Sequence, residues 1–239
     1  MRAKEPHFRP NPTEACPCGT GKTLAHCCLQ FDGTIYKERA SIRPPGPVTG
    51  YSHPGCYLSF TENCDEKLTG EHIESRGILA QIGQQINVTG VPWLKPGEVK
   101  TVGIDRLTAK ILCKRHNSAF STVDATASRF FKILTKANIN LATASLSQRK
   151  QCYLLNGEDL EMWAAKVLLG LLHSQPKRSA LHGYTVDNDI VKTLITTARL
   201  PSAVTAHPPP GRNPATSPMP ADSVAGERVG RHGAIELSG

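Results

Sequence analysis

Long apolar runs are missing from this sequence of 239 residues. A membrane-spanning helix needs about 20 consecutive apolar residues, so no such helix is expected. The N-terminal stretch MRAKEPHFRPNPTEA also lacks the apolar centre of a secretory signal. Both absences predict a protein of the reducing cytoplasm without a membrane segment. In that compartment, eight cysteines favour metal sites over disulfides.

Acidic residues are scarce where basic residues are most frequent. Residues 95–150 carry eleven Lys or Arg against three acids, whereas residues 51–94 carry two basic residues and five acids. A basic segment next to an acidic one suits a surface for polyanions beside a cation site. The alternative is that the Lys and Arg side chains only solvate helix faces.

Large apolar residues become rare after about residue 200, where the chain is rich in proline, glycine and polar residues. We therefore predict a disordered tail over 200–239. The run SIRPPGPVTG ends a linker predicted over 32–50. Apolar residues at helical spacing predict helices over 122–137 and 156–174. The second of these belongs to a helical extension predicted over 137–199.

The segment ACPCGTGKTLAHCCLQ contains GTGKT, which is typical of the end of a nucleotide-binding P-loop, together with four cysteines. A P-loop needs a glycine five residues before its Gly-Lys pair, and that position is Cys16. Four thiols within thirteen residues suit a tetrahedral structural Zn²⁺, with a disulfide or free thiols as the alternatives. The predicted ligands are Cys16, Cys18, Cys27 and Cys28.

CPCGTGKTLAHCC closely resembles the SEC-C motif, a small zinc knuckle also found at the C-terminus of the SecA translocase ATPase. The resemblance covers about residues 14–31 and places the knuckle in residues 1–31. The family is more basic where this chain has Leu24, Ala25 and His26, and His26 could substitute for a ligand. The resemblance implies zinc binding and an accessory module that could dock a protein partner, but no reaction.

A second group of metal-binding residues lies in the centre of the chain. Cys113 and His116, three residues apart, form half of a common zinc site, and Cys56 and Cys64 could form the other half. A zinc bound there would join two segments and stabilise a small core. Four residues remain as groups of the kind that bind Mg²⁺ or activate water. They are Glu71, the adjacent His72, Asn117 and Asp124.

Residues 55–135 resemble the HNH nuclease family, in which an acidic residue and a His end one strand and a Cys-x-x-Cys-Asn element opens the next helix. The resemblance implies that His72 is the general base, that Glu71 binds a catalytic Mg²⁺ or Mn²⁺, and that Asn117 orients the base or binds that metal. Asp124 is a weaker candidate ligand. Lys110, Lys114 and Arg115 would contact the phosphates of DNA or RNA.

This chain departs from the HNH pattern in three ways. Cys56 and Cys64 are separated by seven residues where two is usual, His116 replaces a Cys, and the stretch between His72 and Asn117 is long. The alternative is a noncatalytic module with one or two structural zinc ions that binds nucleic acid or protein. The predicted fold class is α+β, with a zinc knuckle, a ββα-metal (HNH-like) domain over 51–136, packing helices and a disordered tail.

Overall fold

The computed structural model describes residues 11–90, 94–142, 151–174, 185–197, 206–207 and 234–237. The chain divides into two units. The first unit comprises Met1–Arg39, Leu134–Gly157 and Gly230–Gly239, and the second comprises Ala40–Ile133 and Glu158–Val229. Four α-helices and small antiparallel strand pairs form the regular structure of the described residues, in agreement with the predicted mixture of helix and strand.

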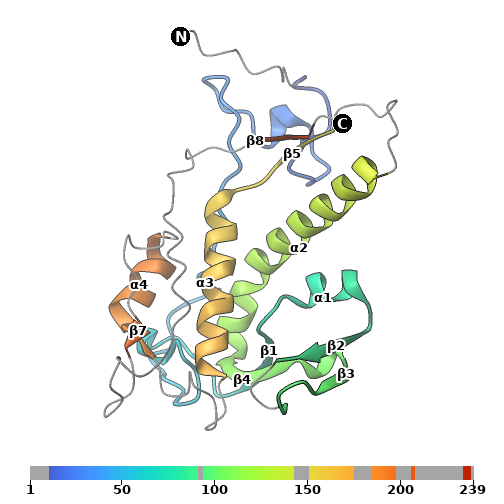
Figure 1. The fold of residues 1–239 in the computed structure, drawn as a ribbon. Helices are drawn as coiled ribbons and strands as arrows, with labels where there is room; N and C mark the ends of the chain where they lie inside the picture. Colours follow the sequence, from blue (N-terminus) through green and yellow to red (C-terminus); the bar gives the residue numbers. More distant parts are fainter. Residues whose placement is uncertain are drawn as a thin grey trace. The chain divides into compact units, whose positions relative to one another are not determined.

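An antiparallel strand pair followed by a long helix lies at the centre of the second unit (Figure 1). β1 (Leu68–His72) pairs with β4 (Thr108–Cys113), and the register shifts between Thr69 and Glu71. The last three residues of β4 are buried, which anchors this strand in the core. α2 (Lys114–Ala142) follows β4 without a loop, so it begins earlier than the helix predicted from the sequence.

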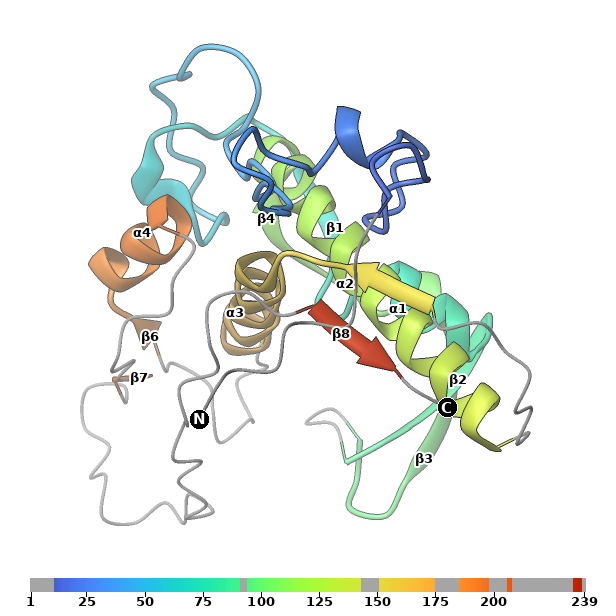
Figure 2. The ribbon, with the colours of Figure 1, turned by 90° about the horizontal axis from the view of Figure 1, so that it is seen from above.

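The chain between β1 and β4 forms a helix and a hairpin. Gln81 Nε2 donates to the backbone oxygen of Ser128 at 2.9 Å, and Figures 1 and 2 both show α1 beside α2. β2 and β3 pair with each other and not with the β1–β4 pair. The elements of this insertion are α1 (Arg76–Ile82), β2 (Gln85–Thr89), β3 (Val99–Gly103) and a 3-10 turn (Ile104–Arg106).

Two further helices complete the second unit. α3 (Gly157–His173) matches the helix predicted over 156–174, and α4 (Asn188–Thr197) follows β6 (Thr185–Val186), which pairs with β7 (Ala206–His207). A second 3-10 turn covers Ser59–Thr61. The core of this unit joins the loop before β1 to three helices, through buried residues that include Leu58, Leu112, Phe120, Val123, Met162, Leu169 and Leu194.

Among its described residues, the first unit has little regular structure apart from the C-terminal end of α2. A 3-10 turn (Leu24–His26) lies within the knuckle, and β5 (Gln151–Leu154) pairs with β8 (Ala234–Leu237). The backbone nitrogen of Leu154 donates to the oxygen of Pro17 at 3.1 Å, which joins β5 to the knuckle. Within the tail predicted to be disordered, β7 and β8 are described; the rest of 200–239 lies outside the described residues.

None of the described helices combines the length and the apolar character needed to cross a bilayer. α2 is the longest, but its 29 residues carry charged side chains along their length.

Candidate functional site

The knuckle cluster consists of Cys16, Cys18, Cys27 and Cys28 in the first unit. Their sulfurs all lie within 4.8 Å of one another, and all four cysteines are free thiols. Cys18 and Cys27 sulfurs are 3.4 Å apart, and Cys27 and Cys28 sulfurs 3.7 Å apart. Two sulfurs bound tetrahedrally to one zinc at about 2.3 Å lie about 3.8 Å apart. The spacing therefore fits a tetrahedral ion and not a disulfide, whose sulfurs are about 2.05 Å apart.

The thiols of the knuckle cluster differ in their surroundings: burial raises the pKa of Cys16 and of Cys28, whereas the pKa of Cys18 is lowered. Burial raises the pKa of the Cys18 thiol. Hydrogen bonds from Thr20 and from neighbouring thiols together outweigh burial, so the pKa is lowered to about 6. Thr20 Oγ1 also lies 3.1 Å from the Cys27 sulfur. Thr20, which stands where the family usually has Ser, thus provides the polar contacts that hold sulfur ligands.

His26 does not belong to the knuckle cluster. Its Nδ1 atom lies 2.8 Å from Thr23 Oγ1, and its side chain is exposed. The four sulfurs form the compact group without it. The suggestion that His26 could substitute for a cysteine therefore has no support in the geometry.

The core cluster consists of Cys56, Cys64, Cys113 and His116, all buried in the second unit. His116 Nδ1 lies 3.5 Å from the Cys56 sulfur, 3.7 Å from that of Cys64 and 3.2 Å from that of Cys113. These three nitrogen–sulfur distances fit the edges that would join nitrogen to sulfur in a tetrahedron around an ion bound by three sulfurs and one nitrogen. The structure thus brings together the four residues that the sequence predicted as one site.

Thr61 determines which nitrogen of His116 is available to a metal. The Thr61 hydroxyl donates its one hydrogen to the oxygen of Leu58 at 2.8 Å, so it accepts a hydrogen bond from His116 Nε2 at 3.0 Å. The proton is then on Nε2, and Nδ1 faces the three sulfurs as a free electron pair. Burial, helped by the nearby Arg115 charge, lowers the pKa of His116 to about 4, which keeps the ring neutral.

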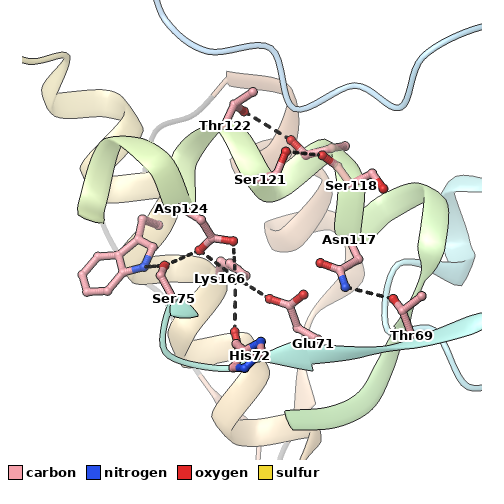
Figure 3. Close-up of polar contacts among 12 residues, drawn as sticks. Thr69, Glu71, His72, Ser75, Asn117, Ser118, Ser121, Thr122, Asp124 and Lys166 are labelled. Carbon is pink, nitrogen blue, oxygen red and sulfur yellow. Dashed lines mark hydrogen bonds and ion pairs between the residues drawn. The ribbon is translucent and has the colours of Figure 1, made fainter. Parts of the chain in front are cut away.

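A buried lysine joins the two acidic residues that the sequence singled out. Lys166 comes from α3, and its Nζ contacts Glu71 of β1 and lies 2.8 Å from Asp124 of α2 (Figure 3). Lys166 is 2% exposed and Glu71 3% exposed. We call Glu71, Asp124 and Lys166 the lysine cluster. Burial raises the pKa of Glu71 to about 7, although the Lys166 ammonium opposes the shift.

Two more residues extend the lysine cluster. Ser75 donates a hydrogen bond to Asp124, and Trp163 Nε1 donates to Ser75 Oγ at 2.8 Å. Lys166 also donates to the backbone oxygen of His72 at 3.3 Å. Sequence reasoning missed both Ser75 and Lys166. The available signal was a single Lys on the apolar face of the helix over 156–174, since an unpaired charge there would be unfavourable.

Asn117 and His72 lie near the lysine cluster. Asn117 Nδ2 donates to Thr69 Oγ1 at 2.9 Å, and Figure 3 shows Asn117 and Glu71 directed into the same region between β1 and α2. Burial lowers the pKa of His72, so its ring is neutral at pH 7. Among the described residues, its buried Nε2 has no hydrogen-bond partner. Glu71 and Asn117 are thus directed into one region and His72 follows Glu71 in β1, while the catalytic roles of all three stay predictions.

The three basic residues predicted to contact phosphates differ in their surroundings. Lys110 and Lys114 are exposed on β4 and at the start of α2. Arg115 is partly buried, and it donates to Asn63 Oδ1 at 2.9 Å and to the oxygen of Pro47 at 2.7 Å. Arg115 therefore also holds the loop before β1 in place.

The geometry of the first unit defines a small thiolate metal knuckle. The family model of the SEC-C motif matches residues 13–30, which contain the whole knuckle cluster. No curated protein and no solved structure matches the chain. The motif and the two clusters indicate zinc binding, as the sequence predicted, whereas the resemblance of residues 55–135 to HNH nucleases stays a prediction.

Proposed function

We propose that this protein holds two structural zinc ions, and that its second unit binds nucleic acid without cleaving it. The observation that carries the noncatalytic part is Lys166, whose ammonium lies between Glu71 and Asp124. These are the carboxylates that a catalytic divalent cation would need. Because Lys166 is covalently part of the chain and 2% exposed, it occupies the position between the two carboxylates that such a cation would take.

The electrostatics of the lysine cluster favour the ammonium over a hard metal ion. One buried ammonium forms ion pairs with both carboxylates and donates hydrogen bonds to Asp124. The pKa of Glu71 is raised to about 7 by burial despite Lys166, so much of the Glu71 population is protonated at neutral pH. Mg²⁺ in proteins is usually held through one or two ionised carboxylates together with water, so a largely protonated Glu71 makes this site a poor one for it.

The nucleic-acid part rests on charge and on rigidity. Lys110 and Lys114 are exposed at the junction of β4 and α2, directly beside the core cluster. A zinc held by four buried ligands would fix that junction and so preorganise both ammonium groups. Contacts of Lys with phosphates give affinity without sequence preference. Docking of a protein through the knuckle stays a prediction of the SEC-C motif.

The test is binding of the zinc-loaded full chain to a short single-stranded DNA, the same sequence as RNA, and duplex DNA, over a range of salt concentrations. We expect affinity to fall steeply with salt, and Lys110→Gln with Lys114→Gln to reduce the slope of log K against log salt by about 2. Lys192→Gln, which removes an exposed lysine of α4, is the matched control. No binding by wild type, or equal slopes for all proteins, would refute the proposal.

Hydrolysis of phosphodiesters is the second candidate, favoured by the neutral His72 with its unpartnered Nε2. His72 would take a proton from water, and Asn117, which donates a hydrogen bond to Thr69, would orient the base or bind the metal. A divalent cation, when bound at Glu71, would stabilise charge on the leaving oxygen.

Plasmid nicking separates the two candidates. Wild type, His72→Ala and Lys166→Met are compared in Mg²⁺ and in Mn²⁺. We expect none of the three to exceed the background. Nicking by wild type that His72→Ala abolishes would replace the noncatalytic proposal with the hydrolytic one.

A further inference from the structure

A cavity of about 530 Å³ lies beside the core cluster, entirely within the second unit. Ligand pockets have volumes of roughly 300–1,000 Å³, so the cavity is large enough for a nucleotide. Three segments line it: the loop ending at Tyr51, the residues from Cys64 to Glu66, and the first turns of α2. Because Cys64 belongs to the core cluster, the zinc site would support one wall.

One wall of the cavity is aromatic. Tyr51 is 40% exposed, and its ring meets His53 edge to face with centroids 6.2 Å apart. The Tyr51 backbone is fixed, since its oxygen accepts a hydrogen bond from Cys64 N at 2.9 Å. An exposed ring on a fixed backbone is suited to stacking against a nucleobase, a contact worth about 1–3 kcal/mol per base in single-strand binding proteins.

Lys114 and Arg115 bring two positive charges to the lining of the cavity, which also contains the acids Asp65 and Glu66. Lys114 is exposed, and Arg115 is held by Asn63 and Pro47. Both of these acceptors are uncharged, so they orient the guanidinium without neutralising it. A guanidinium held in place next to an exposed ammonium is a suitable pair for a phosphate group.

The cavity also has an unsatisfied acceptor. Among the described residues, the buried Oδ1 atom of Asp65 has no hydrogen-bond partner. Buried carboxylate oxygens are normally paired, so an orphaned one lining a cavity indicates a missing donor. The N–H groups on the edge of a nucleobase are donors of this kind.

We propose that this cavity binds one nucleotide, with the base on Tyr51, the phosphate at Lys114 and Arg115, and an N–H edge of the base at Asp65. The inference rests on the proposed nucleic-acid binding, and it names a single nucleotide as the part of the nucleic acid that the cavity recognises. Guanine is the preferred base, because it alone presents two adjacent N–H donors to one carboxylate. The positive charges alone would have predicted phosphate contacts without any base preference.

The test is calorimetry of the zinc-loaded full chain with GMP, AMP, UMP and ribose 5-phosphate. We expect GMP to bind most tightly and ribose 5-phosphate to bind at least about fivefold more weakly, because it lacks the stacked base. Tyr51→Ala should weaken GMP binding by a similar factor. Asp65→Asn should bring the affinities for GMP and UMP together, whereas Glu62→Gln, outside the cavity lining, should leave both unchanged.

Equal affinity for GMP and ribose 5-phosphate, or GMP binding unaffected by Tyr51→Ala, would overturn the inference. Zinc content and thermal unfolding of each variant are measured first, so that a misfolded variant is not scored. Glu62→Gln and Asp65→Asn together keep the test informative even where Tyr51→Ala fails to fold. Salt-dependent binding of oligonucleotides without any GMP binding would reject this cavity while leaving the proposed function intact.

Discussion

The two metal clusters of this chain differ in how far apart their ligands lie in the sequence. The knuckle cluster takes all four sulfurs from Cys16 to Cys28. The core cluster joins Cys56 to His116, sixty positions away, through three separate segments. In each group, the ligand atoms all lie within 4.8 Å of one another. A local ligand set can be recognised from spacing alone, whereas a distributed set depends on the fold that brings its members together.

The two clusters also differ in the packing around them. The knuckle cluster packs against a small core, in which Leu24 is the buried apolar residue besides the cysteines. The core cluster is continuous with the main core of the second unit, and Cys113 is 0% exposed. A zinc in the knuckle would support a local turn, while a zinc in the core cluster would support the junction of β1, β4 and α2.

Loss of a core-cluster ligand is expected to have the largest effect. Cys113→Ser should release one zinc and destabilise the second unit by at least about 5 kcal/mol, because the free energy of structural zinc binding is part of the folding free energy. That is comparable to the whole stability of a typical domain. Metal content by mass spectrometry and chemical denaturation of the full chain measure the two effects.

Cys16→Ser is the matched variant in the knuckle. It should also release one zinc, but leave the main unfolding transition unchanged, because its cluster packs only against local residues. Two zinc ions per wild-type chain are expected. If both variants lower the main transition equally, the two clusters do not differ in the way described above.

Removal of Lys166 is expected to have the second-largest effect on stability. Lys166→Met leaves Glu71 and Asp124 without their shared cation, and breaking a buried ion pair by removing one partner costs about 3–5 kcal/mol. Adding Glu71→Gln and Asp124→Asn should restore much of the loss. Lys132→Met, at an exposed position of α2, should change the stability by less than about 0.5 kcal/mol. A small effect of Lys166→Met would contradict the buried pairing.

The titration of Glu71 is expected to change the stability with pH by somewhat less than the removal of Lys166 does. Its pKa is raised from 4.5 in the unfolded chain to about 7 in the fold. The folded state therefore binds the proton more tightly, so the stability that Glu71 contributes falls as pH rises from about 4.5 to about 7.

Glu71→Gln removes this titration. Relative to wild type, the variant should gain stability by up to about 3 kcal/mol between pH 4.5 and pH 8, by linkage. Urea denaturation at several pH values measures the difference, and Glu62→Gln at an exposed site serves as the control. A difference that is constant with pH would show that Glu71 has an ordinary pKa.

Replacement of His26 is expected to have the smallest effect. His26→Ala should keep two zinc ions per chain and change stability by less than about 0.5 kcal/mol, because the exposed His26 contacts Thr23 and not the sulfurs. Competition with a chromogenic chelator measures zinc affinity. A loss of one zinc would make His26 a ligand and would remove the contrast between an all-sulfur knuckle and a mixed core cluster.

Several features could be predicted from residue types and spacing. The SEC-C motif was recognisable because its ligands and glycines lie within a short segment. The helix over 156–174 was placed to within one residue at each end, because its apolar face and acidic first turn are local signals. Apolar periodicity placed the start of α2 too late, because the polar run from Lys114 to Ser118 carries none, whereas the HNH resemblance implied a helix that opens at the element from Cys113 to Asn117.

Partners contributed by distant elements could not be predicted in the same way. Thr61 fixes the tautomer of His116 from 55 positions away, and Lys166 reaches Asp124 from a different helix. Asp65 gives no signal in the sequence that distinguishes it from any surface acid, and only the packing around it leaves its oxygen without a donor.

The sequence alone therefore predicted both groups of candidate metal ligands, because thiol and imidazole groups at these spacings suit a tetrahedral zinc site. Only the tertiary structure decided what surrounds them. Folding places the Lys166 ammonium between two carboxylates and leaves a cavity beside Cys64. Charge pairing and cavity shape depend on distances between segments far apart in the chain, and residue spacing along the chain does not specify those distances.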